Sequence, residues 1–145
     1  MRYLAATYGT GSLWPPTPAA RSFADRWMDW AATTLQPDFM KLFWGYYRMP
    51  ENQRDLPAIK AAVDACNHHF GVLDAQLKNQ PFLGGTEFTM ADIPAGTTLY
   101  RYFEMGVEVA RPPHVRQWYD RLALRPAFRQ HIMVRFDELR GRTDY

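Results

Sequence analysis

The sequence has little of what disulfide-built or membrane-spanning proteins need. Cys66 is its only cysteine, so no internal disulfide can form, which agrees with a reducing compartment. No apolar run reaches the roughly 18 residues that span a bilayer, and residues 1–4 lack the long apolar core of a signal peptide. These absences predict a cytoplasmic protein that does not enter membranes.

Complete catalytic, metal-binding and phosphate-binding patterns are also missing. His68 and His69 are adjacent, so on a helix they diverge by about 100° and do not hold one metal ion together. Gly84-Gly85 lacks the wider glycine pattern and the following lysine of a phosphate-binding loop. Cys66 lies among regularly spaced apolar residues, where burial raises the pKa of a thiol and blunts its reactivity. We therefore predict no catalytic residue, cofactor-binding residue or metal ligand in this chain.

The charge distribution gives no clear signature of nucleic-acid binding. The net charge is +2, and acidic residues are interspersed among the basic ones. Five arginines follow one another at spacings of four or five residues: Arg111, Arg116, Arg121, Arg125 and Arg129. Because Glu108 precedes them, Asp120 lies among them and further acids follow in the tail, a solvated helix face is the favoured interpretation, and nucleic acid is not an expected partner.

The sequence does contain enough apolar material for one core. With 47% hydrophobic and 15% aromatic residues among 145, burial can offset the entropy lost when a single domain orders. Glycines and prolines divide the chain into segments of helix length, and no internal repeat is visible. We predict an all-α bundle of five to six helices formed by residues 1–145.

The clearest helical patterns lie in the first half of the chain. Thr17 can cap a helix that begins at Pro18 and continues to about Arg48, with a bend at Pro37. From residue 55 onward, apolar residues alternate spacings of three and four over three heptads: Leu56, Ile59, Val63, Cys66, Phe70, Leu73 and Leu77. Three heptads beside similar helices favour packing in an intramolecular bundle over an intermolecular coiled coil.

A folding device is predicted at the start of a central helix. Thr89 and Asp92 have the spacing of a capping box, in which the Thr89 hydroxyl accepts from the Asp92 amide and the Asp92 carboxylate accepts from the Thr89 amide. Phe88 and Ile93 flank the box as a hydrophobic staple. The helix after it should turn its apolar residues inward: Ile93, Gly96, Leu99, Tyr100 and Phe103. Asp92 is thus better explained by folding than by acid or base catalysis.

Shorter segments complete the chain. Residues 1–8 predict a helical fragment that ends at Gly9, and two further helices are expected to open at Pro112-Pro113 and at Pro126. The first of these two carries its apolar residues on one face: Val115, Trp118, Tyr119 and Leu122. The polar residues 137–145 predict a loosely held tail.

Four strings closely resemble the C-terminal domain of cytosolic glutathione S-transferases: residues 82–85 (FLGG), 88–94 (FTMADIP), 112–122 (PPHVRQWYDRL) and 125–128 (RPAF). Three earlier strings are similar to the junction and first long helix of bacterial members: residues 2–5 (RYLA), 13–15 (LWP) and 24–30 (ADRWMDW). The resemblance covers about residues 1–134. It implies that residues 1–15 are a remnant of the junction between two domains.

The resemblance also implies a function shared with a second domain. Family members carry a thioredoxin-like N-terminal domain that binds glutathione, their co-substrate, and activates its thiol. This chain begins after the place where that domain would end, so the chain alone is expected to be inactive. By resemblance, the pocket for a small hydrophobic electrophile would be lined by Ser22, Arg26, Trp27 and Trp30. The same helix, with Arg21 and Asp25, would lie at the interface of a homodimer.

A second class of function stays open at this point. Helical domains that resemble this one also serve as non-catalytic interaction and assembly modules, which need a partner surface and no thiol-activating residue. Five aromatic side chains are candidates for such a surface: Trp14, Phe43, Trp44, Tyr46 and Tyr47. Large exposed apolar patches usually mark an interface, so exposure of these side chains would indicate a docking surface or the place of a missing neighbour, whereas their burial would weaken both arguments.

Overall fold

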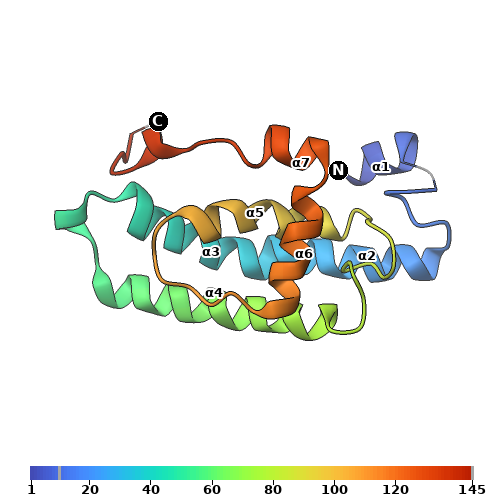
Figure 1. Ribbon diagram of the computed structural model, residues 1–145, viewed down its shortest axis with the longest axis horizontal. Coiled ribbons are helices and arrows are strands. Elements are labelled where there is room, and N and C mark those ends of the chain that lie inside the picture. The colour runs from blue at the N-terminus through green and yellow to red at the C-terminus, as the bar shows by residue number, and fades with distance from the viewer. Residues whose placement is uncertain (10, 145) are drawn as a thin grey trace.

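The computed structural model describes residues 1–9 and 11–144, and their regular structure is helical (Figure 1). The α-helices are α1 (Arg2–Tyr8), α2 (Pro18–Trp30), α3 (Gln36–Leu42), α4 (Leu56–Leu77), α5 (Asp92–Glu104), α6 (Pro113–Ala123) and α7 (Pro126–His131). Helices α2 and α3 belong to one continuous helical run. Counted as one, they leave six α-helices among the described residues. The predicted all-α bundle is confirmed.

The helical run of α2 and α3 extends from Pro18 to Arg48. Thr17 Oγ1 accepts a hydrogen bond from the Ala20 amide at 3.2 Å and caps its start. Between the α-helical parts lies a π-helical segment, η1 (Ala31–Leu35), and a second one, η2 (Phe43–Arg48), ends the run. Pro37 is the second residue of α3, just after η1, and has no amide N–H to donate, so the wider π turn before it accommodates the missing hydrogen bond.

Helix α4 packs against α3 and α6 along the predicted heptad face. Its inward residues are buried, among them Ile59, Cys66, Phe70, Leu73 and Leu77. The expectation for Leu56 was wrong, because this side chain is 70% exposed. Leu56 is the first residue of α4, and α3 and α6 do not cover it. The heptad pattern of the sequence therefore begins before the buried core does.

Helix α5 runs beside α2 and α3, and α6 crosses it (Figure 1). Gly96 allows the close approach of α6, because a Cβ there would lie 2.8 Å from Leu122 Cδ1. Leu99 and Phe103 are buried as predicted, whereas Ile93 and Tyr100 are only half-buried. The apolar stripe of α5 is therefore not fully covered by its neighbours.

Helix α6 is capped by a side chain from a different helix. The Asp74 carboxylate of α4 accepts hydrogen bonds from the His114 amide at 2.7 Å and the Val115 amide at 3.1 Å. It also contacts His114 Nδ1 at 2.9 Å. The pKa of Asp74 lies below its usual range: burial would raise it, but these hydrogen bonds together lower it. This contact fixes the start of α6 on the bundle.

The segment predicted to be a loose tail makes several contacts with η2. Phe136, just before it, is buried and lies 4.8 Å from the Tyr47 ring. The Gly141 amide donates to the Tyr47 carbonyl at 2.9 Å. The Arg48 guanidinium donates to the Arg142 and Asp144 carbonyls, the latter at 2.7 Å. Residues 136–144 are thus joined to the end of the long helical run.

Candidate functional site

The four residues that the sequence proposes for a co-substrate pocket form a strip along α2. Ser22 and Arg26 are exposed, Trp30 is half-buried and Trp27 is 7% exposed. The Arg26 guanidinium lies 4.3 Å from the Phe23 ring centre and 5.5 Å from that of Trp27. The Trp27 and Trp30 rings meet edge to face at 5.5 Å. The strip therefore combines aromatic surface with one accessible cation.

Polar groups support the inner edge of this strip. Trp30 meets the His69 ring edge to face at 5.7 Å, and His69 Nε2 lies 2.9 Å from Asp38 Oδ2. Lys41 and then His69 lower the pKa of Asp38 below its usual range by hydrogen bonding to the carboxylate. Trp27 Nε1 is buried without a hydrogen-bond partner among the described residues. Trp27 consequently keeps an unused hydrogen-bond donor.

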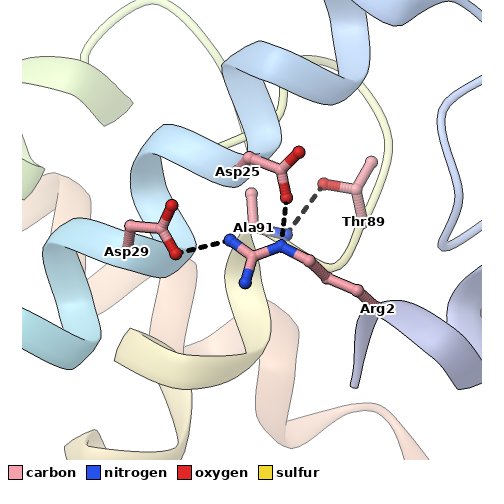
Figure 2. Close-up of polar contacts among 5 residues, drawn as sticks. All are labelled: Arg2, Asp25, Asp29, Thr89 and Ala91. Carbon is pink, nitrogen blue, oxygen red and sulfur yellow. Dashed lines mark hydrogen bonds and ion pairs between the residues drawn. The ribbon is translucent and has the colours of Figure 1, made fainter.

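Helix α1 is attached to the same stretch of α2 through Arg2 (Figure 2). Arg2 Nε donates to Asp25 Oδ1 and Arg2 Nη2 donates to Asp29 Oδ1, both at 2.5 Å. Arg21 Nη1 donates to the Pro15 carbonyl at 3.0 Å. Arg21 and Asp25, both expected at a dimer interface, thus have partners within the chain. Arg2 is 44% exposed, so its ion pairs orient α1 more than they stabilise it.

The buried carboxylate of Asp92 is the most highly connected acidic group at the start of α5. It is 1% exposed and accepts from the Leu83 amide at 2.8 Å, the Thr89 amide at 3.0 Å and Trp118 Nε1 at 3.0 Å. The hydrogen bond from Thr89 is the one that the capping box requires of Asp92. Burial raises the pKa of Asp92 to about 6, against the opposing effect of these hydrogen bonds. Asp92 thus joins the 82–85 turn, α5 and α6.

The hydroxyl of Thr89 differs from the expected capping geometry. Thr89 Oγ1 accepts from the Ala91 amide at 3.3 Å (Figure 2). The Asp92 amide donates instead to the Thr89 carbonyl at 3.1 Å. Residues 89–91 lie outside α5, whose first residue is Asp92. The sequence predicted a helix that begins directly after Thr89. In the structure residues 89–91 form a tighter turn, and the helix begins at Asp92.

Two adjoining cavities lie away from the α2 strip. The larger, about 290 Å³, lies between the start of α5, the end of α6 and α7, and is lined by Leu13, Phe88, Asp92, Ile93, Thr97, Leu122, Arg125, Ala127, Phe128, His131 and Ile132. The smaller, about 180 Å³, lies between α3, α5 and α7 and is lined by Gln36, Phe39, Met40, Thr97, Thr98, Arg101, His131 and Ile132. The staple residues Phe88 and Ile93 both face the larger cavity. None of Ser22, Arg26, Trp27 and Trp30 lines either one.

Other titratable groups form no reactive cluster. Burial raises the pKa of the Cys66 thiol to about 12, which keeps it protonated and unreactive. Within residues 1–9 and 11–144, no three His, Cys, Asp or Glu side chains converge as metal ligands would. None of the helices in these ranges is long and apolar enough to cross a membrane.

Residues 35–126 match the family described as glutathione S-transferase, C-terminal domain. The chain belongs to this family. Glutathione S-transferase GstB of Escherichia coli K12 is 38% identical over 92% of this chain, and the chain spans 64% of the length of GstB. Glutathione S-transferase 3 of Zea mays is 27% identical over 90% of the chain, which spans 62% of that protein.

Solved structures agree with this assignment. The theta class glutathione S-transferase of the citrus canker pathogen Xanthomonas axonopodis pv. citri, in its apo form, superposes with a TM-score of 0.89 and is 44% identical. The match covers 92% of this chain and 70% of that one. The same enzyme with glutathione bound superposes with a TM-score of 0.88, and the match covers 64% of its chain. The resemblance inferred from the sequence strings is confirmed.

Proposed function

We propose that this chain is the helical half of a glutathione S-transferase, an enzyme that conjugates glutathione to electrophiles in the cytoplasm. The observation that carries the proposal is the 38% identity to GstB over 92% of this chain. The chain spans 64% of GstB, so that relative has a further part to which nothing in this chain corresponds. We assign glutathione binding and thiol activation to a thioredoxin-like domain equivalent to that part.

The exposed face of α1 supports contact with such a domain. Tyr3 is 75% exposed, Leu4 58% and Tyr8 79%, whereas Ala5 is the buried residue of this helix. Three large apolar or aromatic side chains on so short a helix form a surface that a neighbouring domain would cover. The Arg2 contacts with Asp25 and Asp29 hold this surface in a fixed place beside α2.

In this proposal the α2 strip lines the pocket of a small hydrophobic electrophile. Trp27 and Trp30 supply an aromatic wall, of which the half-buried Trp30 is the more accessible part. Ser22 and Arg26 are exposed polar groups at the rim, where they orient the substrate. The outward side of the same helix contributes to a homodimer interface.

A domain fusion tests the proposal. The part of GstB that this chain does not cover is joined ahead of Met1, and conjugation of glutathione to 1-chloro-2,4-dinitrobenzene is measured for the fusion and for the 145-residue chain. The fusion should be active and the chain alone inactive. In the fusion, Trp30→Ala should raise the KM for the electrophile and leave the KM for glutathione unchanged. Activity of the chain alone, or a folded fusion without activity, contradicts the proposal.

The five aromatic residues named as candidates for a partner surface do not form an exposed patch, so they do not support the interaction-module alternative. Phe43 is 5% exposed and Tyr47 1%, and Trp14, Trp44 and Tyr46 are half-buried. The Tyr46 hydroxyl also donates to the Gly106 carbonyl at 2.9 Å. Because these aromatic residues are buried or half-buried, they give no support to a docking surface, and they give none to a missing neighbouring domain either.

A further inference from the structure

The ring of Trp30 lies between two other rings that come from different helices. Trp27, also in α2, meets it edge to face, with ring centres 5.5 Å apart and an interplanar angle of 81°. His69, in α4, meets it edge to face at 5.7 Å and 87°. Such contacts are directional, because the positive edge of one ring is attracted to the negative face of the other. Together they restrict how the half-buried Trp30 ring can turn.

His69 is itself fixed by a carboxylate of a third helix. Its Nε2 lies 2.9 Å from Asp38 Oδ2 of α3, and the His69 side chain is only 12% exposed. The hydrogen bonds from Lys41 and then His69 hold the pKa of Asp38 below its usual range, so this carboxylate is ionised near neutral pH. An ionised carboxylate can only accept, so His69 Nε2 carries the hydrogen and donates it. The imidazole therefore has one defined tautomer and orientation.

The other oxygen of Asp38 is engaged at the surface of the bundle. Lys41 Nζ donates to Asp38 Oδ1 at 2.8 Å, and the Lys41 side chain is 70% exposed. An ion pair this exposed contributes little to the stability of the fold. The connection that reaches Trp30 thus begins at Lys41 and passes through three helices, α3, α4 and α2. Its main effect falls on the orientation of the rings.

We propose that His69 is a positioning residue for the electrophile and acts through Trp30. The inference rests on the proposed function, in which Trp30 is the accessible part of the pocket wall. With the imidazole held by Asp38, the indole keeps one orientation before the electrophile arrives. Without His69, the indole would lose rotational freedom only when the electrophile binds, which weakens binding. A wall that holds the unreactive body of a substrate binds it alike in the ground and transition states, so the loss appears in KM and not in kcat.

The first measurement uses NMR of the 145-residue chain and does not depend on glutathione. The ring protons of His69 and Trp30 should show nuclear Overhauser contacts, and the Trp30 indole should give one sharp signal. His69→Gln keeps an amide donor for Asp38 but removes the ring, so it should shift and broaden this signal. His68→Gln is the matched control, because His68 is the exposed neighbour on the same helix, and it should leave the Trp30 signal unchanged.

The second measurement uses the fusion with the GstB segment. His69→Gln should raise the KM for 1-chloro-2,4-dinitrobenzene about two- to tenfold, the range that one edge-to-face contact represents. The kcat and the KM for glutathione should stay unchanged, as should all three constants in His68→Gln. Asp38→Ala releases the imidazole and should raise the same KM, whereas Asp38→Asn keeps an acceptor for His69 and should restore it.

Failure of this inference and failure of the proposed function give different results. A folded but inactive fusion, or a fusion in which Trp30→Ala leaves the KM for the electrophile unchanged, overturns the proposed function and the pocket role of His69 with it. If Trp30→Ala raises this KM, equal values in His69→Gln and His68→Gln overturn the positioning role alone. Absence of nuclear Overhauser contacts between His69 and Trp30 in the wild-type chain also overturns it.

The Asp38 variants keep the test decisive should His69→Gln fail to fold by circular dichroism. Asp38→Ala and Asp38→Asn change a residue near the surface, whose side chain is 25% exposed. A KM for the electrophile that is higher in Asp38→Ala than in Asp38→Asn supports the inference. Equal values in these two variants overturn it.

Discussion

Asp92→Ala should destabilise the fold severely, because it removes the shared acceptor of three N–H donors. The Leu83 amide, the Thr89 amide and the Trp118 indole all donate to this carboxylate, which is 1% exposed. A buried donor left without a partner costs about 1–3 kcal/mol. Three such donors predict a loss of about 3–9 kcal/mol, a large share of the 5–15 kcal/mol typical of a domain.

The pH dependence sharpens this prediction. Burial raises the pKa of Asp92 from 3.8 to about 6, so the folded state holds the proton more tightly than the unfolded state does. The stabilisation from this group is therefore complete below about pH 4 and declines as the pH rises through about 6. Between pH 4.5 and 7 the decline is about 2 kcal/mol. The difference between wild type and Asp92→Ala should shrink by that amount over the same range.

Urea unfolding followed by tryptophan fluorescence and circular dichroism measures both effects. Asp64→Asn is the control, because Asp64 is an exposed residue of α4 that pairs with Lys60, and its loss should cost less than about 1 kcal/mol. In the wild type, the NMR signal of the Trp118 indole proton should titrate near pH 6. An Asp92→Ala variant within 1 kcal/mol of wild type, or an indole signal that does not titrate between pH 5 and 7, refutes the reasoning.

Three further predictions concern other parts of the bundle. Cys66 should react with a thiol reagent only as fast as the chain unfolds, because burial raises its pKa to about 12; rapid labelling of the folded chain contradicts this. Asp74→Ala should lower the free energy of unfolding by about 1–2 kcal/mol, because it leaves the first turn of α6 uncapped. An unchanged urea midpoint contradicts the capping role. Gly84→Ala should cost about 1–3 kcal/mol, because the added Cβ would lie 2.4 Å from Thr89 Oγ1. Gly71→Ala, inside α4 with nothing within 4 Å, should instead stabilise the chain by about 0.5–1 kcal/mol in the same unfolding assay.

Local patterns predicted the helices well because helix formation depends on neighbours in the sequence. Thr17 with Pro18 predicted the start of α2, and the spacings of four and three between Cys66, Phe70 and Leu73 predicted the buried face of α4. A repeating pattern carries no information about where a neighbouring helix ends. This is why the same heptad pattern placed Leu56 in the core, although it is exposed.

Contacts between distant segments could not be predicted in the same way. The pairing of Trp118 with Asp92 spans 26 residues, and the capping of α6 by Asp74 spans 40. Both depend on how α4, α5 and α6 cross, which no local spacing encodes. A usable signal existed for Trp118, because a buried indole N–H needs an acceptor and Asp92 is the acid at the start of the neighbouring helix.

The candidate sites show the same limit. Ser22, Arg26, Trp27 and Trp30 were proposed from the family resemblance, and they lie together because all four belong to α2. The two cavities beside α5 and α7 draw on residues far apart in the chain, including Leu13 and Arg101, and no pattern linked them. The half-buried Ile93 was expected in the core because its spacing fits an apolar stripe, yet part of that stripe lines a cavity.

The electrophile preference of the fusion with the GstB segment tests the central claim most directly. The values of kcat/KM are measured for a panel of aryl halides, epoxides and unsaturated carbonyl compounds, with GstB alongside. If this chain lines the co-substrate pocket, the fusion should keep the glutathione KM of GstB and differ from it in the ranking of the electrophiles. An identical ranking in the two proteins would contradict the account, because the pocket would then be formed without the residues of this chain.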